Sequence, residues 1–163
     1  MQSDSIIAIA GPTASGKSAV AIQVARLARA HGVEIEIISM DSALPYRGMD
    51  IGTAKPSPEE LQEFIHHGIN ICEPEETYSA AKFAKDAKQW IQEIQARGHI
   101  PLIVGGTMLY WRALAHGLSN LPTSDPAIRQ AITVQAQERG WPAMHDELTA
   151  IDPETAQRLQ KND

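Results

Sequence analysis

The chain has 163 residues, of which 43% are hydrophobic and 21% charged, the balance of a soluble globular protein with enough residues for a real core. It has no run of about 18 apolar residues, which excludes a transmembrane helix. Its single cysteine, Cys72, excludes an intramolecular disulfide and a multi-cysteine metal site. The formal net charge of -6 argues against a nucleic-acid partner, whose phosphates attract clustered Lys and Arg, but does not exclude a local basic patch.

The N-terminus lacks the features of a secretory signal. Met1–Ile7 carries Asp4 and no basic residue, and a glycine-rich motif follows almost at once. A signal peptide needs a basic start and a longer apolar stretch. Together with the single cysteine, this predicts a cytoplasmic protein without a membrane partner.

Residues 1–118 alternate short apolar runs with helical patterns, which is typical of βαβ units around a parallel sheet. Strands are predicted at Ile6–Ala10 and Ile35–Ser39, with a weaker candidate at Ile69–Cys72. The helix after the first strand is expected to have one apolar face, formed by Val20, Val24 and Leu27 beside Ala21, Ala25 and Ala28.

The clearest helix is predicted to begin after Ser79, a good N-cap, and to end at Gly98. Its apolar residues recur with the helical period as one stripe: Ala80, Phe83, Ala84, Ala87, Trp90, Ile91 and Ile94. A strand at Ile100–Val104 then leads through a glycine turn into a helix at about Met108–His116. These elements predict an α/β fold of the P-loop NTPase type, with a parallel sheet, flanking helices and an incomplete core in residues 1–118.

The pattern changes after Gly117, because no strand-like run follows it. Instead, short helices are expected after Asp125-Pro126 and Asp152-Pro153, where Asp caps free amides and Pro occupies the first helical position. Another short helix is expected to run from Pro142 to Leu148. Residues 119–163 are therefore predicted to form a separate helical appendage.

The strongest motif is G-x-x-x-x-G-K-[ST], which is matched in full by Gly11, Pro12, Thr13, Ala14, Ser15, Gly16, Lys17 and Ser18. It lies between a predicted strand and a predicted helix, where backbone amides can surround an anion and the helix dipole adds positive potential. Lys17 would reach the outer phosphate, and the Ser18 hydroxyl would ligate Mg²⁺. The motif predicts di- or triphosphate binding, without saying what is transferred.

Asp41 follows the second strand, and ligands of open α/β sheets gather at the carboxyl ends of strands. Three roles are open for it: Mg²⁺ ligand, general base, or cap of the following turn. The segment Tyr46–Pro56 has little apolar periodicity and is predicted to be a functional loop. Within it, Arg47 and Lys55 are each interpreted as solvated surface charges.

Four stretches resemble the tRNA dimethylallyltransferases: GPTASGKS at Gly11–Ser18, DSALPYRGMDIGTAKP at Asp41–Pro56, IPLIVGGTMLY at Ile100–Tyr110 and LPTSDPAIR at Leu121–Arg129. The glycine-rich motif is shared by many NTPases, whereas YRGMDIGTAKP and VGGTMLY are far more specific. The resemblance implies transfer of a dimethylallyl group from dimethylallyl diphosphate to N6 of an adenosine next to the tRNA anticodon. The motif would then hold the diphosphate of the prenyl donor rather than ATP.

The resemblance also implies roles for individual residues. Thr13 matches a threonine that hydrogen-bonds the bridging oxygen of the donor, Lys17 and Ser18-bound Mg²⁺ stabilise the leaving diphosphate, and Asp41 matches the general base. The adenine must be flipped out of the anticodon arm to be reached. Positions matching tRNA contacts are Asp41, Ser42, Ala43, Leu44, Thr107, Arg129, Leu159, Gln160, Lys161, Asn162 and Asp163, and the appendage matches the start of a tRNA-binding insertion.

Some positions depart from the family pattern. Pro45 replaces an aliphatic residue, and Gln160-Lys161 replaces His-Pro. Family members are expected to be roughly twice as long, with a catalytic arginine in the further part. The chain is therefore expected to be the N-terminal portion of such an enzyme, and to be inactive or only weakly active alone.

Other functions account for part of the sequence. A small P-loop kinase of a nucleotide or metabolite would explain the glycine-rich motif and Asp41, but not YRGMDIGTAKP. An adenylate isopentenyltransferase prenylates free AMP, and such a small acceptor would leave the helical appendage without a binding role. A non-catalytic fragment that binds diphosphate agrees with the family.

His66-His67 is interpreted as a surface pair rather than a metal site, and no protein partner is inferred.

Overall fold

The computed structural model describes residues 6–117 and 125–162 and divides the chain into two compact units, Met1–Ser119 and Asn120–Asp163. The predicted boundary between residues 118 and 119 lies outside the described residues. No helix within the described ranges is long and apolar enough to cross a bilayer.

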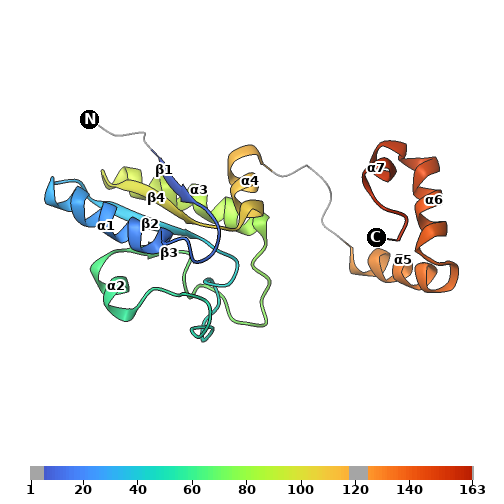
Figure 1. Ribbon diagram of the computed structural model, residues 1–163, viewed down its shortest axis with the longest axis horizontal. Helices are drawn as coiled ribbons and strands as arrows, with labels where there is room; N and C mark the ends of the chain where they lie inside the picture. Colours follow the sequence, from blue (N-terminus) through green and yellow to red (C-terminus); the bar gives the residue numbers. More distant parts are fainter. Residues whose placement is uncertain (1–5, 118–124, 163) are drawn as a thin grey trace. The chain divides into compact units, whose positions relative to one another are not determined.

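The first unit is a parallel β-sheet flanked by helices (Figure 1). Its elements are β1 (Ile7–Ala10), α1 (Lys17–Ala30), β2 (Ile35–Met40), α2 (Pro58–Glu63), β3 (His66–His67), α3 (Ala80–Ala96), β4 (Ile100–Gly105) and α4 (Met108–His116). The strand order is β1-β4-β2-β3, and every neighbouring pair is parallel. The predicted α/β fold with a parallel sheet is confirmed.

Side chains that alternate along β2 and β4 enter two separate cores, because successive residues of a strand point to opposite faces. Helix α1 packs on the face that carries Ile37 and Leu102. Helices α3 and α4 pack on the other face, against Ile38 and Ile103. The stripe predicted for α3 is confirmed, since Phe83, Ile91 and Ile94 are buried, and the Ser79 side chain caps the helix by accepting a hydrogen bond from the Lys82 amide at 3.2 Å.

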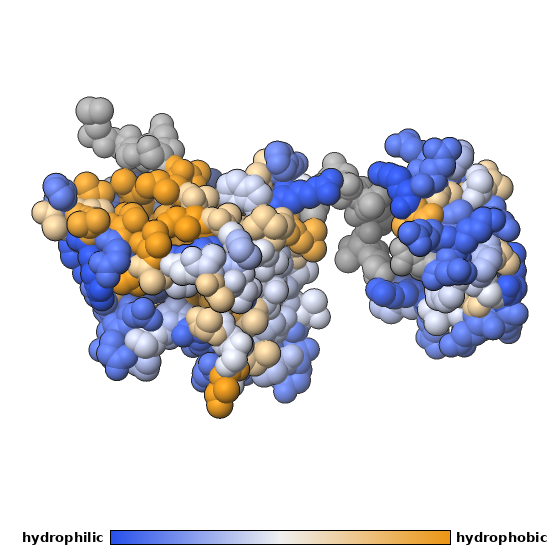
Figure 2. All heavy atoms as spheres, viewed as in Figure 1, coloured by the Kyte–Doolittle hydropathy of each residue, from blue (hydrophilic) through white to orange (hydrophobic). Residues whose placement is uncertain are grey.

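The predicted face of α1 is confirmed in part. Ala21 and Ala25 are buried, and Val24 and Ala28 pack against the core, as predicted. Val20 and Leu27 are instead 51% and 63% exposed, and Ile22, which was not predicted, is buried. The small side chains of Ala21 and Ala25 let the helix approach the sheet closely, while Val20 and Leu27 lie outside the contact. Val20 and Leu27 are therefore exposed apolar side chains, as are Ile6 and Ile7 at the edge strand β1. Figure 2 shows hydrophobic residues gathered over this part of the first unit.

The strand predicted at Ile69–Cys72 is also wrong. The strand in this region is β3, two residues at His66–His67, and the segment after it contributes a single isolated bridge between Cys72 and Tyr46. Gly68 and Asn70 have φ angles of 80° and 55°. These left-handed conformations break the extended backbone that a strand requires.

The second unit contains α5 (Pro126–Arg139), α6 (Trp141–Ile151) and α7 (Pro153–Arg158). As predicted, Asp125 and Asp152 cap α5 and α7: their side chains accept hydrogen bonds from the amides of Ala127 at 2.8 Å and Thr155 at 3.0 Å. Helix α6 is longer than predicted, because it begins directly after Gly140, which adopts φ 81°.

Candidate functional site

A pocket of about 550 Å³ lies at the carboxyl ends of β2 and β4 and beside the start of α1. Three segments that are distant in sequence form its wall: the glycine-rich loop (Gly11–Ser18), the residues after β2 with part of the following loop, and the turn after β4. The lining residues are Thr13, Ala14, Gly16, Lys17, Ser18, Ala19, Asp41, Ser42, Ala43, Leu44, Gly52, Thr53, Ala54, Val104, Gly105, Gly106 and Thr107. We call this the main pocket.

Two residues of the glycine-rich loop have left-handed backbone conformations. Ala14 and Gly16 have φ angles of 62° and 82°, and left-handed residues in such a turn bring successive N–H groups together into an anion-binding nest. Helix α1 has no side-chain cap, so its first amides have no side-chain partner. The Lys17 ammonium folds back on the loop and donates to the Pro12 carbonyl and, at 3.5 Å, to the Ser15 hydroxyl. The loop therefore has the geometry expected of a phosphate cradle.

Two glycines allow the end of β4 to pass between β2 and the glycine-rich loop. A Cβ atom on Gly105 would lie 2.0 Å from the Met40 carbonyl oxygen, and one on Gly106 would lie 2.8 Å from the Gly11 carbonyl oxygen. The Gly11 amide also donates to the Gly105 carbonyl at 3.3 Å. Only glycine permits this close approach, and it sets the distance between the loop and Asp41 at the end of β2.

The Asp41 carboxylate is fixed by the turn that follows it. Its Oδ1 accepts hydrogen bonds from the amides of Ala43 at 2.8 Å and Leu44 at 3.4 Å, so the capping role left open by the sequence is present. Thr107 Oγ1 accepts a hydrogen bond from the Ser42 amide at 3.1 Å, which ties this turn to the start of α4. Among the described residues no side chain or amide pairs with Asp41 Oδ2. One carboxylate oxygen therefore orients the group, while the other is not used by this turn.

Lys55 does not behave as the predicted surface charge. Its side chain is only 6% exposed, and its ammonium donates to the Tyr46 carbonyl at 2.9 Å and to Asp50 and Asn70 at 2.7 Å each. Lys55 thus joins both ends of the Tyr46–Pro56 loop to the segment after β3 and holds Gly52–Ala54 against the main pocket. Arg47 remains 57% exposed, as expected, and pairs with Glu73.

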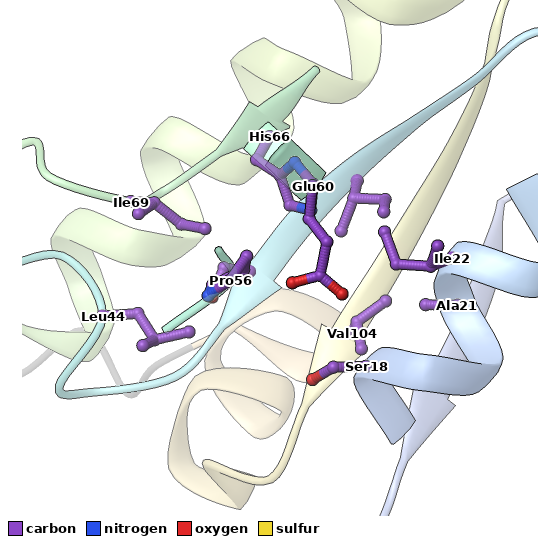
Figure 3. A pocket seen from close by; sticks show the side chains of 11 residues that line it. Ser18, Ala21, Ile22, Leu44, Pro56, Glu60, His66, Ile69 and Val104 are labelled. Carbon is purple, nitrogen blue, oxygen red and sulfur yellow. The ribbon is translucent and has the colours of Figure 1, made fainter. Parts of the chain in front are cut away.

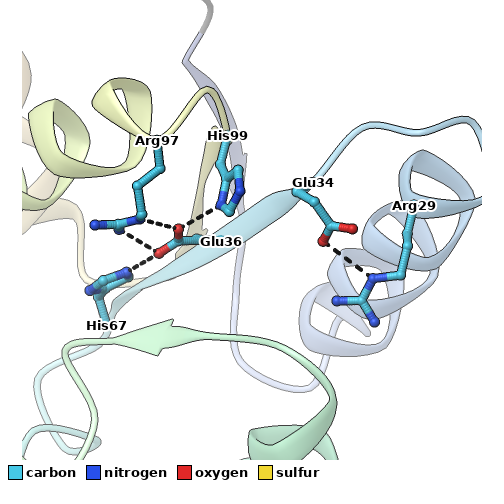
Figure 4. Close-up of polar contacts among 6 residues, drawn as sticks. All are labelled: Arg29, Glu34, Glu36, His67, Arg97 and His99. Atoms are coloured by element: carbon cyan, nitrogen blue, oxygen red, sulfur yellow. Dashed lines mark hydrogen bonds and ion pairs between the residues drawn. The ribbon is translucent and has the colours of Figure 1, made fainter.

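Glu36, on β2, is the centre of a buried ionic cluster that the sequence did not reveal (Figure 4). It is 1% exposed and accepts two hydrogen bonds from Arg97 at 2.8 Å, one from His67 at 2.7 Å and one from His99 at 2.8 Å. Burial opposes ionisation, but the hydrogen bonds from Arg97 and the two histidines outweigh it and lower the pKa of Glu36 to about 2. The expectation of a surface role for His66-His67 is wrong, since both are half-buried and His67 belongs to this cluster.

The remaining predicted site residues belong to the second unit. Arg129 lies on α5 with an exposed side chain, and Leu159–Asn162 follow the end of α7. Lys161 pairs with Asp146 at 2.8 Å. Asp163 lies outside the described residues.

Comparison with known proteins gives consistent results. A family model described as IPP transferase matches residues 44–163. A tRNA dimethylallyltransferase of Polynucleobacter asymbioticus is 57% identical over 97% of this chain and 47% of its own length, and one of Cupriavidus taiwanensis is 56% identical over 97% and 48%. The chain thus spans about half the length of these curated relatives.

Solved structures agree with the sequence relatives. The full-length tRNA isopentenylpyrophosphate transferase of Bacillus halodurans superimposes with a TM-score of 0.65 and 39% identity, over 99% of this chain and 52% of that one. A eukaryotic dimethylallyltransferase described as acting on tRNA superimposes with a TM-score of 0.75 and 28% identity, over 97% of this chain and 38% of that one. In both cases this chain matches part of a longer chain.

Proposed function

Because the chain belongs to the IPP transferase family, we propose that its main pocket binds dimethylallyl diphosphate and that the whole protein transfers the dimethylallyl group to tRNA. The acceptor is N6 of an adenosine next to the anticodon, and a cytoplasmic location follows from this substrate. The family assignment replaces the kinase hypothesis that the glycine-rich motif alone left open.

The observation that carries the proposal is that the glycine-rich loop and Asp41 line the same pocket. A prenyl transfer to an amine needs two different groups within reach of one carbon atom. An anion cradle must hold the leaving diphosphate, and a base must receive the proton of the attacking amine. The main pocket brings both together from segments separated by the whole of α1 and β2.

The donor side of the pocket stabilises the leaving group. As the bond between the allylic carbon and the diphosphate oxygen breaks, the electron pair stays on the diphosphate. The loop amides and the Lys17 ammonium stabilise this developing charge, and the Thr13 hydroxyl donates to the bridging oxygen. The loop amides are already gathered at the cradle, whereas the Lys17 ammonium exchanges its bond to the Pro12 carbonyl for one to the phosphate.

The oxygens near Ser18 fit Mg²⁺ better than a softer metal. Within the described residues no cluster of three or more His, Cys, Asp or Glu side chains could enclose a metal ion. Mg²⁺ does not need such a cage, because it takes much of its shell from phosphates and water and binds one or two protein oxygens. Ser18 would supply one of these oxygens, and the bound ion would neutralise charge on the diphosphate.

The acceptor side depends on Asp41. The N6 lone pair of adenine is delocalised into the ring, so the amine must lose a proton as the new C–N bond forms, and Asp41 receives that proton. The amides of Ala43 and Leu44 hold Oδ1, which leaves Oδ2 for the amine. The base is flipped into the pocket beside Ser42–Leu44 and Thr107, while Arg129 and residues 159–163 contact the anticodon arm.

The proposal is tested by transfer of label from radiolabelled dimethylallyl diphosphate to unmodified tRNA, with the chain and its Asp41→Asn variant. Asn keeps an oxygen for the Ala43 amide but is not a base, so label incorporation is expected to fall about 100-fold or more. Because the relatives are about twice as long, incorporation by the chain itself is expected to be weak. Undiminished transfer by the variant would refute the role of Asp41.

A further inference from the structure

A second, smaller cavity adjoins the main pocket on the face of the sheet covered by α1 (Figure 3). It has a volume of about 40 Å³ and shares Ser18, Leu44 and Val104 with the main pocket. We call it the side cavity. Its lining residues are Ser18, Ala21, Ile22, Ile37, Ser39, Leu44, Pro56, Glu60, His66, Ile69 and Val104. Although most of the wall is apolar, four polar side chains reach it from α1, β2, α2 and β3.

Ser39 is a buried polar residue in the wall of the side cavity. The residue is 5% exposed, and its Oγ has no hydrogen-bond partner among the described residues. A buried hydroxyl without a partner is destabilising, so such groups are normally satisfied by protein or by ordered water. The side cavity has room for a few water molecules.

Glu60 is held with its carboxylate in the side cavity, on the side that faces Ser18 (Figure 3). It is the third residue of α2, and its Oε2 accepts a hydrogen bond from the Ser57 amide at 2.8 Å as part of a capping box. This bond uses one oxygen and fixes the side chain. The other oxygen is available to a ligand between α1 and α2.

The strand beside β1 supplies no carboxylate near Ser18. In P-loop NTPases, Mg²⁺ is held by the Ser or Thr of the loop together with an Asp at the end of a neighbouring strand. Here β4, the neighbour of β1, ends in Val104 and Gly105 and offers no carboxylate. Val104 and Ser18 line both cavities, and Glu60 lines the side cavity with them.

We propose that Glu60 and Ser39 hold the water shell of the Mg²⁺ ion that Ser18 and the diphosphate bind. This inference rests on the proposed function, because it assumes a diphosphate in the glycine-rich loop. Mg²⁺ dehydrates reluctantly and usually keeps several waters, which need acceptors such as a carboxylate and a hydroxyl. An apolar prenyl tail in the side cavity would instead leave the Ser39 hydroxyl and the Glu60 carboxylate without partners. Because Glu60 and Ser39 hold the water shell of the ion, Asp41 is not needed as a metal ligand and serves as the base.

The test measures Mn²⁺ affinity of the 163-residue chain saturated with inorganic diphosphate, by the enhancement of water-proton relaxation. Glu60→Gln removes the charge but keeps an oxygen for the Ser57 amide, so α2 stays capped. Its dissociation constant for Mn²⁺ is expected to rise about tenfold, the usual effect of losing an outer-shell ligand. Glu59→Gln is the matched control, since Glu59 lies in the same helical turn with the same charge but is exposed. It is expected to leave the affinity unchanged.

Ser39→Ala gives a second, independent arm. It is expected to weaken Mn²⁺ binding a few-fold without lowering thermal stability, because it removes a hydroxyl that has no partner in the described structure. If Ser39 had only a structural role, Ser39→Ala would lower thermal stability and leave the Mn²⁺ affinity unchanged. The inference would be overturned if Glu60→Gln and Glu59→Gln changed the Mn²⁺ affinity equally, or if Glu60→Gln left it unchanged. Tighter binding of dimethylallyl diphosphate by Ser39→Ala would also overturn it, because it would indicate a prenyl tail.

Calorimetry with inorganic diphosphate and a chelator separates this inference from the proposed function. Diphosphate binding by the wild-type chain and by Glu60→Gln is expected to be equal when no metal is present. If diphosphate binds but Glu60→Gln leaves Mn²⁺ affinity unchanged, only the role of Glu60 fails. If the wild-type chain does not bind diphosphate, both proposals fail.

Discussion

Loss of the Glu36 side chain should destabilise the fold strongly, since it is buried and accepts hydrogen bonds from Arg97 and two histidines at once. Replacing one partner of a buried ion pair leaves the others unpaired and typically costs about 3 kcal/mol or more. Glu36→Gln is therefore expected to lower the free energy of unfolding in urea by about this amount. The neighbouring pair of Glu34 with Arg29, at 3.3 Å and about half exposed, is the control (Figure 4). Glu34→Gln should change stability by less than about 0.5 kcal/mol.

The same cluster gives stability a defined pH dependence. The pKa of Glu36 is lowered from 4.5 to about 2, so its ionised form is favoured in the folded state. Its contribution is therefore fully present above about pH 4.5 and is lost as the pH falls toward 2. Unfolding curves in this range should show a loss of stability that Glu36→Gln does not show. An identical pH profile for both proteins would contradict the assigned cluster.

At the residue scale, sequence reasoning found groups with a local signature and missed those defined by distant partners. The glycine-rich loop and Asp41 were identified because their spacing from predicted elements places them at one edge of the sheet. Glu36 and Lys55 were not, since their partners lie far along the chain, as with Arg97, 61 positions after Glu36. Charge alone gives no sign of such pairing. Glu60 had a usable signal, the Ser57-x-x-Glu60 capping box, which also marks helix α2.

At the scale of elements, the close packing of β4 against β2 depends on Gly105. A methyl group there would meet the Met40 carbonyl oxygen at 2.0 Å, and both atoms belong to the sheet, so neither can move freely. Gly105→Ala is expected to lower stability by about 3 kcal/mol, at the upper end of ordinary overpacking, measured by thermal unfolding. Gly11→Ala is the control, because its Cβ would meet only side-chain atoms, the nearer at 3.4 Å. Equal stability of Gly105→Ala and wild type would show that β4 and β2 lie further apart.

Elements defined by strong periodicity or clear caps were predicted to within a residue or so, as β2 and α4 show. Elements that depend on the backbone conformation of single residues were not predicted correctly. The strand expected at Ile69–Cys72 fails because Asn70 is left-handed, a conformation that the apolar residues around it do not indicate. On α1 the periodicity identified Ala21 and Ala25 correctly but assigned Val20 and Leu27 to the buried face, where the structure places Ile22.

At the scale of the whole chain, two compact units divide the proposed work. The first contains the anion cradle, the base and the residues proposed to hold the flipped adenine, and the second contains Arg129 and residues 159–163, which are proposed to contact the anticodon arm. The net charge of -6 did not predict this partner, because one charge sum does not describe individual surfaces. The motifs around the main pocket gave the family, and the chain spans about half the length of its curated relatives.

The central claim is that the glycine-rich loop holds the diphosphate of a prenyl donor, and calorimetric titration with dimethylallyl diphosphate and Mg²⁺ tests it most directly. The wild-type chain is expected to bind saturably. Lys17→Ala should weaken binding about tenfold or more, since a charge-assisted hydrogen bond contributes about 1.5–3 kcal/mol. Asp41→Asn should bind the donor like wild type, because Asp41 acts on the acceptor. Absence of binding by the wild-type chain, or binding that does not depend on Lys17, would contradict the account.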